Sequence, residues 1–282
     1  MTDKIAESKV STVAWNRQTW QNYEWPEGGD EWSAPWGGTH AMWHAFIMPR
    51  IARFVPAEHI LEIAPGFGRC TQYLLSLCKR LTAVDLAPRC VQACRERFRV
   101  GQADGAAHLE LHVNDGMSLP MVNDGSVDFA FSWASLVHAR HEAMRSYVLE
   151  LSRVLRPGGA AFLHHSNYGV YTEGRDLDQI RDAPGNRGAD MTAEKLRADC
   201  ADCELLCAAQ ELIPQCGPGV YNDCCSLVFR PRTDAPFEPA DTVVLERSDL
   251  RAELHLIRRL SRLYEACGVD RSLDTDEKGS GR

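Results

Sequence analysis

The sequence predicts an α/β fold: a doubly wound, mostly parallel seven-stranded sheet with an N-terminal helical cap and a C-terminal helix. Three observations lead to this prediction. Short apolar runs alternate with helical segments from residue 59 onward, a glycine-rich turn follows the first run, and polar residues follow the later runs. Ligands of such sheets bind at the carboxyl ends of the strands, so functional residues are expected there.

The elements follow one another in a regular order. Strands are expected at 60–64, 81–85, 108–113, 126–133 and 160–165, with helices at 69–79, 88–98 and 141–155. Pro88 lies in the first turn of its helix, as helix starts favour. Beyond these, we expect a helix at 192–206 and two strands at 210–213 and 221–229, which form an antiparallel hairpin at the edge of the sheet.

We divide the chain into a cap or lid at 1–54, a domain at 55–232, a linker with a C-terminal helix at 233–271, and a disordered tail at 272–282. Six of the seven tryptophans lie in the first 54 residues. They indicate an aromatic-rich cap over the site, and the alternative is an extension that packs on the sheet. The helix expected at 248–266 has one apolar side, which can cap the domain or support a homodimer.

Composition restricts the partners. The net charge of −8 argues against a nucleic-acid partner, because neutralising phosphates needs clustered Lys and Arg. No apolar run reaches about 18 residues, so no membrane partner is expected. The chain starts without an apolar leader and has eleven cysteines, which suggests reduced thiols in the cytoplasm. Cys200, Cys203 and Cys207 share one helical face, which favours a core position over a metal site, and no metal is expected.

The turn after the first strand separates two kinds of cofactor. It reads Ala64-Pro65-Gly66-Phe67-Gly68-Arg69-Cys70-Thr71, and Thr71 stands where a dinucleotide-binding turn has its third glycine. Glu62 precedes the turn and suits a positively charged cofactor, whereas it would repel a pyrophosphate. At the ends of the next two strands, Asp85 can accept from both ribose hydroxyls and Asp115 from an adenine amino group.

These elements, in this order and spacing, resemble the class I S-adenosylmethionine-dependent methyltransferases. The resemblance covers residues 59–166 and extends more weakly to 230. It implies a Rossmann-like fold, methyltransferase activity and S-adenosyl-L-methionine as the cofactor. Ala64 departs from the family, which usually has glycine there, but alanine is small enough for the backbone to pass. The cofactor-binding candidates are Trp36, Glu62, Ala64, Gly66, Gly68, Asp85, Leu86, Asn114, Asp115, Gly116, Ser132 and Trp133.

The methyl acceptor is expected near the ends of the fourth and fifth strands. His138 follows the fourth strand, and the fifth ends in His164-His165-Ser166-Asn167-Tyr168. A hydroxyl acceptor needs a base to take its proton, and His138, His164 and His165 are the candidates. Strand alternation sends His164 and His165 to opposite faces, so at most one of these two faces the site. The alternative for each histidine is a buried residue that fixes a loop.

The segments Trp32-Ser33-Ala34-Pro35-Trp36-Gly37 and Tyr221-Asn222-Asp223 extend the resemblance to a bacterial small-molecule group. That group includes methionine S-methyltransferases and O-methyltransferases of glycan gene clusters. We favour S-methylation of L-methionine, because an aromatic-rich cap suits a thioether and a nascent sulfonium. Arg187 would then take the carboxylate and Asp223 the ammonium. The substrate-binding candidates are Trp43, Asn167, Tyr168, Arg187, Tyr221 and Asp223.

Two alternatives stay open. The first is O-methylation of a sugar or another small hydroxyl compound, with one of the three histidines as the base. The second is a non-catalytic module that binds S-adenosylmethionine without turnover. A small-molecule substrate is the expected partner in the two catalytic cases.

Overall fold

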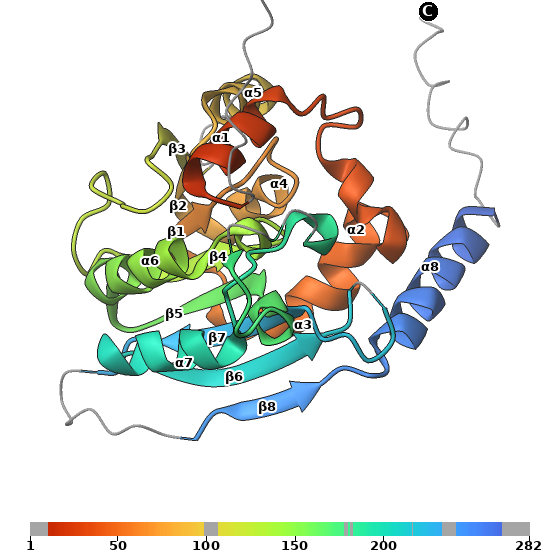
Figure 1. Ribbon diagram of the computed structural model, residues 1–282. Coiled ribbons are helices and arrows are strands. Elements are labelled where there is room, and N and C mark those ends of the chain that lie inside the picture. Colours follow the sequence, from red (N-terminus) through yellow and green to blue (C-terminus); the bar gives the residue numbers. More distant parts are fainter. Residues whose placement is uncertain are drawn as a thin grey trace, which may run out of the picture.

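The computed structural model describes residues 11–98, 107–177, 180, 183–215, 217–232 and 241–266. One eight-stranded sheet runs through them in the order β3-β2-β1-β4-β5-β7-β6-β8, with helices on both faces (Figure 1). The strands are β1 (Ala57–Ile63), β2 (Cys78–Asp85), β3 (His108–Val113), β4 (Val127–Ser132), β5 (Leu155–Ser166), β6 (Leu206–Ile213), β7 (Asp223–Phe229) and β8 (Val243–Glu246). The α-helices are α1 (Val13–Asn22), α2 (Thr39–Met42), α3 (Met48–Ile51), α4 (Thr71–Leu74), α5 (Pro88–Phe98), α6 (His141–Val154), α7 (Ala193–Asp202) and α8 (Leu250–Ala266).

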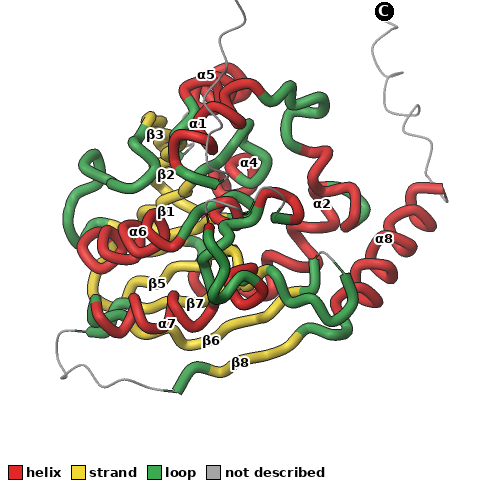
Figure 2. The backbone as a smooth tube through the Cα atoms, viewed as in Figure 1, coloured by secondary structure: helices red, strands yellow, loops and turns green. Residues whose placement is uncertain are grey.

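The sheet is mostly parallel, as predicted. Strands β3, β2, β1, β4 and β5 pair in parallel, whereas β7 lies antiparallel between β5 and β6. The predicted hairpin is therefore present, but the number of strands is eight and not seven. β8 pairs in parallel with β6 and takes the edge position that the hairpin was expected to hold. Figure 2 shows the strands as one layer between helices.

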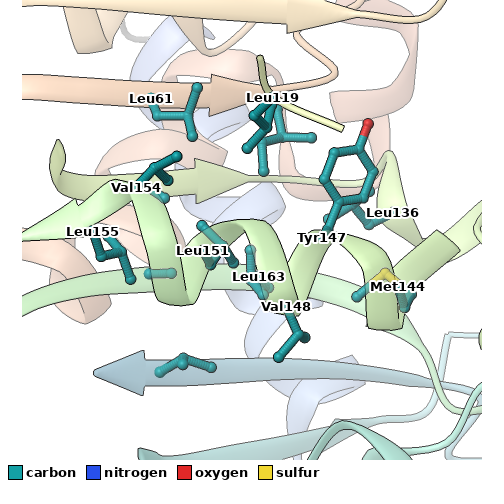
Figure 3. Close-up of a cluster of buried hydrophobic side chains, with 14 of the residues drawn as sticks. Leu61, Leu119, Leu136, Met144, Tyr147, Val148, Leu151, Val154, Leu155 and Leu163 are labelled. Carbon is teal, nitrogen blue, oxygen red and sulfur yellow. The ribbon is translucent and has the colours of Figure 1, made fainter. Parts of the chain in front are cut away.

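One face of the sheet is covered by α6 and α7. Leu61 of β1 and Leu163 of β5 point to this face, where they meet Tyr147 and Leu151 of α6 (Figure 3). Alternation along each strand sends the neighbouring side chains to the other face. Leu61 thus belongs to one apolar cluster and Ile60 to the other, so the central strands are buried on both sides.

The second half of the cap forms the core on the other face. Trp43 begins a π-helix (Trp43–Ile47) between α2 and α3, is 1% exposed and stacks on Tyr73 at 4.8 Å between ring centroids. It also packs edge-on against Phe131 of β4. Trp43 is therefore a core residue, and the prediction that it binds substrate is wrong. The apolar side of this segment is needed to cover the sheet, which leaves Trp43 no access to a ligand.

Several boundaries differ from the prediction: β5 begins at Leu155 and not at 160, and α7 ends at Asp202 because β6 already begins at Leu206. The helix expected at 69–79 is only α4, followed by a 3-10 turn (Leu75–Leu77), because Cys78 already pairs with Ala57 in the sheet. The segment expected as linker and helix adds β8 to the sheet and places Leu250 of α8 in the core. The expected linker residues 233–240 and the tail 272–282 lie outside the described residues.

The far part of α8 presents apolar side chains to solvent. Leu256, Leu260 and Leu263 are 55%, 42% and 53% exposed, while the helix contacts α2 and the 3-10 helix Asp30–Trp36 (η1) on its inner side. Among the described residues, no helix has the length and apolar character needed to cross a membrane.

Candidate functional site

A cavity of about 550 Å³ opens at the carboxyl ends of the central strands, beneath the cap. Its volume lies in the range of small-molecule sites. The sheet side supplies Glu62, Asp85, Trp133 and His164, from the ends of β1, β2, β4 and β5 or just beyond them. The cap closes the cavity with α1 and the following segment, which contribute Val13, Asn16, Trp20, Trp25, Trp32 and Trp36.

The glycine turn lies directly beneath the cap. Gly66 has a φ of +59°, and a Cβ there would lie 2.9 Å from the Trp25 ring. Trp25 in turn stacks on Phe67, with 4.5 Å between ring centroids. Ala64 has a φ of +58°, a left-handed conformation that glycine adopts without strain. Position 64 therefore has the backbone conformation that favours glycine, and alanine adopts it at a conformational cost of about 1 kcal/mol.

Two buried carboxyls face the cavity from the sheet. Burial raises the pKa of Glu62 to about 8, even though its carboxyl accepts a hydrogen bond from Thr71 Oγ1 at 2.6 Å. Burial also raises the pKa of Asp85 to about 6, against the hydrogen bonds from the Ala87 and Gly66 amides. The Arg69 cation acts to lower the pKa of Glu62 but does not offset its burial. Asp85 ends β2 beside the turn.

This donor set fits S-adenosyl-L-methionine. Asp85 can accept from ribose hydroxyls, and Glu62 can pair with a positive charge. Leu86, Met117 and Val13 supply apolar walls to the same cavity. Trp36, Ala64, Gly66 and Gly116 also line it, as expected for cofactor-binding residues.

The loop after β3 departs from the prediction. The Asp115 carboxylate accepts from the Met117 and Ser118 amides and from Ser118 Oγ, so it closes a local turn instead of facing the cavity. Asn114 is buried and donates to Tyr147 Oη and to the Ser118 carbonyl. Gly68 and Ser132 are likewise absent from the cavity wall; Ser132 Oγ donates to the Ile63 carbonyl. Asp115 itself is exposed and lies outside the cavity wall, unlike the position expected for an adenine-binding residue.

His138 faces the cavity with a defined tautomer. Its Nδ1 lies 3.1 Å from the Asn186 carbonyl oxygen. A carbonyl can only accept, so Nδ1 carries the proton and Nε2 has the lone pair. Burial, together with the nearby Arg187 cation, lowers the pKa of His138 to about 4. His138 is therefore neutral at physiological pH.

The other two candidate bases are held in structural roles. His164 Nδ1 accepts from the Ala134 amide at 3.1 Å, so its proton is on Nε2, 3.4 Å from an Asp223 carboxylate oxygen. His165 Nδ1 bonds the Ser166 carbonyl and Nε2 bonds Ser226 Oγ. As alternation predicts, His164 lines the cavity and His165 does not. Neither ring of this pair has a lone pair available to a substrate, so the prediction of a base at His164 or His165 is not supported.

Arg187 and Asp223 bind each other. The guanidinium donates from Nε and Nη2 to the two carboxylate oxygens at 2.7 Å each. Burial acts to raise the pKa of Asp223, but His164 and Arg187 hold it well below its usual range. Arg187 lines the cavity, whereas Asp223 is fully buried behind it. The prediction that these residues bind opposite ends of an amino acid is therefore corrected: they form one buried ion pair.

Three other substrate-binding candidates lie outside the cavity wall: Asn167, Tyr168 and Tyr221. Asn167 donates to the Tyr221 carbonyl and accepts from the Ala193 amide, which ties β5 to α7. Tyr168 begins a 3-10 helix (Tyr168–Tyr171), and its ring packs against Tyr171. The Asn167 side chain thus organises the loops at this edge of the sheet.

Sequence reasoning missed several residues of the wall. Asn16, Arg69 and Asn186 line the cavity, along with Trp20 and Trp25. The sequence predicts that Trp20 and Trp25 belong to the cap but does not indicate that their side chains line the cavity. Arg69 could have been predicted, because it directly follows the glycine turn, and this turn lies at the carboxyl end of β1. Nothing in the sequence indicated Asn16, whose position depends on how α1 docks.

Residues 60–159 match a family model described as a methyltransferase domain. This segment contains the glycine turn, Asp85 and His138. The segment is thus similar to methyltransferase domains, and the chain shares the fold of a solved S-adenosylmethionine-dependent methyltransferase.

Similar proteins share only part of the chain. A ubiquinone/menaquinone biosynthesis C-methyltransferase of Rubrivivax gelatinosus is 32% identical over 43% of this chain and 44% of its own length. A malonyl-(acyl-carrier protein) O-methyltransferase of Serratia marcescens is 30% identical over 52% of this chain and 53% of its own. The chain thus spans about half the length of these curated relatives. A solved S-adenosylmethionine-dependent methyltransferase from Methanosarcina mazei shares the fold, with a TM-score of 0.50 and 18% identity over 65% of this chain and 98% of that one.

Proposed function

We propose that the protein is an S-adenosylmethionine-dependent methyltransferase of a small molecule, that the acceptor is a hydroxyl group, and that His138 takes its proton. One observation carries the proposal: His138 is neutral and protonated on Nδ1 by its contact with the Asn186 carbonyl. Its Nε2 has no acceptor or donor among the described residues. Of the three candidate histidines it is the one with an available lone pair.

The chemistry needs a base of modest strength. Bound S-adenosyl-L-methionine would supply the methyl group, and its transfer to the acceptor oxygen would break the bond from that carbon to sulfur and leave S-adenosylhomocysteine. As the acceptor oxygen bonds to that carbon, its proton becomes strongly acidic, so a base with a pKa of about 4 still accepts it. The proton moves to His138 Nε2, while Nδ1 keeps its bond to the Asn186 carbonyl. The name of the Serratia relative, an O-methyltransferase, supports an oxygen acceptor.

The cap excludes water and keeps the base in position. Asn16 Nδ2 donates to the His138 carbonyl at 2.8 Å, and the Trp20 ring lies 4.9 Å from the imidazole. Ser11 Oγ donates to the same Asn186 carbonyl that fixes His138 Nδ1. The cap thus fixes both the backbone of His138 and the carbonyl that its imidazole contacts. Positioning of a reacting group in this way contributes much of the rate enhancement in group transfer.

The test uses His138→Asn, because the amide N–H of asparagine can stand where Nδ1 stands but offers no equivalent of Nε2. With labelled cofactor and a panel of sugars, small alcohols and amino acids, the native chain is expected to methylate a hydroxyl compound. His138→Asn should lower kcat about 10²- to 10⁴-fold while the Kd for S-adenosylhomocysteine stays unchanged. His108→Asn, a substitution at an exposed position of β3, is the control. Full activity of His138→Asn on a hydroxyl acceptor would exclude His138 as the base.

S-methylation of L-methionine is the second candidate, supported by the indoles of the cavity. Trp20, Trp25, Trp32, Trp36 and Trp133 all line it, and aromatic faces stabilise a sulfonium cation. A thioether has no proton to lose, so His138→Asn should leave this reaction intact. A product 14 mass units heavier than methionine, with a fixed positive charge, would identify it. If no acceptor in the panel yields S-adenosylhomocysteine, the non-catalytic binding module becomes the better description.

A further inference from the structure

The outer side of α8 is both apolar and basic. Its exposed leucines, Leu256, Leu260 and Leu263, follow one another at spacings of four and three residues, which places them in one stripe along the helix. With 3.6 residues per turn, the flank next to this stripe carries four further exposed residues, all of them arginines: Arg251, Arg258, Arg259 and Arg262. Apolar and positively charged side chains thus lie side by side on one exposed surface.

The four arginines of α8 are not neutralised by the protein. In the part of the chain that the structure describes, none of them makes a hydrogen bond or an ion pair. Arg95 and Arg97 of α5, by contrast, donate to backbone carbonyls. The one carboxylate between residues 251 and 263 is that of Glu253, and it is bound by Arg247. The positive charge of the flank is therefore available to a partner.

The inner side of α8 is already occupied. The helix lies at the margin of the molecule beside α2 (Figure 1). It packs closely on the cap, because a Cβ on Gly37 would lie only 3.1 Å from the Arg258 Cα. The cap segment η1, which α8 contacts, supplies Trp32 and Trp36 to the cavity wall. α8 is thus anchored on its inner side, while its leucines and arginines face outward next to the cap.

We propose that the outer side of α8 docks on an anionic lipid surface. A helix that lies in the plane of such a surface buries its apolar side about 5–10 Å deep and keeps its basic side chains at the headgroups. The three leucines form the side that is buried. The arginines, with their long side chains, reach the lipid phosphates from the flank.

Two properties of the whole chain are compatible with this docking. An interfacial helix needs only one apolar side, so the lack of a long apolar run, which argues against a spanning helix, does not bear on it. The net charge of −8 does not cancel the arginines of α8, because salt screens charges over about 10 Å.

A second copy of the chain fits this surface less well. When a two-fold axis pairs two antiparallel helices, the same flank of each helix meets its equivalent. The arginines of one α8 would then face the arginines of the other, and like charges repel. A stable protein interface also takes about 20–30 residues from each partner. Between residues 251 and 263, α8 has nine exposed residues.

Co-sedimentation of the full chain with lipid vesicles tests the proposal. The vesicles contain phosphatidylcholine alone or an equal mixture of phosphatidylcholine and phosphatidylglycerol, which is anionic. The native chain should bind the mixed vesicles and not those of phosphatidylcholine. Raising the salt concentration from about 0.1 M to 1 M should weaken the binding, because the screening length falls from about 10 Å to 3 Å.

Substitutions on α8 should weaken the binding while matched substitutions elsewhere should not. Arg259→Gln should lower the affinity for the mixed vesicles about fivefold. Leu260→Ser should lower it about tenfold, because one inserted side chain is lost. The controls are Arg95→Gln and Leu149→Ser, the same changes at exposed positions of α5 and α6. All four variants should keep the native Tm, since the substituted side chains are exposed.

Three results would overturn the proposal. The first is that the native chain does not bind the mixed vesicles. The second is that Arg95→Gln weakens the binding as much as Arg259→Gln, which would assign the attraction to overall charge and not to α8. The third is a native dimer in sedimentation velocity that Leu260→Ser converts to a monomer, which would assign the outer side of α8 to a second copy of the chain.

Discussion

Glu62 should make the stability of the ligand-free protein depend on pH. Burial of the carboxyl raises its pKa from the ordinary 4.5 to about 8 in the folded chain. A group whose folded pKa is raised contributes stability that is complete below its unfolded pKa and is lost as pH rises through the folded value. The window for Glu62 is therefore pH 4.5 to 8, and stability falls across it.

The size of the effect follows from the shift. Each pKa unit corresponds to about 1.4 kcal/mol, so between pH 5 and pH 8 Glu62 alone should cost roughly 3 kcal/mol of unfolding free energy. Glu62→Gln removes the titration and keeps a side-chain oxygen that can accept from Thr71 Oγ1. The variant should match the native chain at pH 5 and exceed it in stability at pH 8.

Urea unfolding at pH 5, 6.5 and 8 measures this difference. Other groups titrate too: Asp85 has its pKa raised to about 6, and His138 has its pKa lowered to about 4. Comparing Glu62→Gln with the native chain at each pH cancels their contributions. A difference between the two proteins that stays constant from pH 5 to pH 8 would refute the reasoning.

Other predictions concern the turn, the core and the helix α8. Gly66→Ala forces a Cβ to 2.9 Å from Trp25 at a φ of +59°, so cofactor titration should show weaker binding. Ala64→Gly relieves a left-handed alanine and should raise the unfolding free energy by about 0.5–1 kcal/mol in urea titrations. Trp43→Ala should lower it by about 3–5 kcal/mol, because this ring is fully packed. If the chain dimerises through α8, Leu260→Glu should convert the dimer to a monomer in light scattering, since Leu260 is 42% exposed.

The order of elements was predictable because the central strands are buried on both faces. A short, mostly apolar run such as Ile60-Leu61-Glu62-Ile63 in β1, followed by a glycine turn, has few alternative structures. β8 was not predicted, because its residues are exposed and not buried. All four of its residues are exposed, and Val243, Val244 and Leu245 show no alternation, so only pairing with β6 makes them a strand.

The site was predictable where the backbone alone determines the geometry. Glu62, Asp85 and Gly66 follow strand ends, and parallel strands bring their carboxyl ends together. Asp115 also follows a strand end, but its own loop offers two amides and a hydroxyl within hydrogen-bond distance. Arg187 and Asp223 are 36 residues apart, and no pattern in the sequence indicates that they pair.

The cap and the acceptor side form one unit, and the backbone strain of the chain is concentrated there. Six non-glycine residues of the described chain have a positive φ, and five of them line the cavity: Ser11, Trp25, Ala64, Ala134 and Asn186. Such conformations cost about 1–3 kcal/mol each and persist only where surrounding contacts enforce them. The contacts are visible at three of these residues. Asn186 offers its carbonyl to His138, Ser11 donates to that carbonyl, and Ala134 donates to His164. These contacts fix the orientation of the imidazoles, so residues of the N-terminal segment, although distant in sequence from residues 60–159, belong to the wall of the cavity.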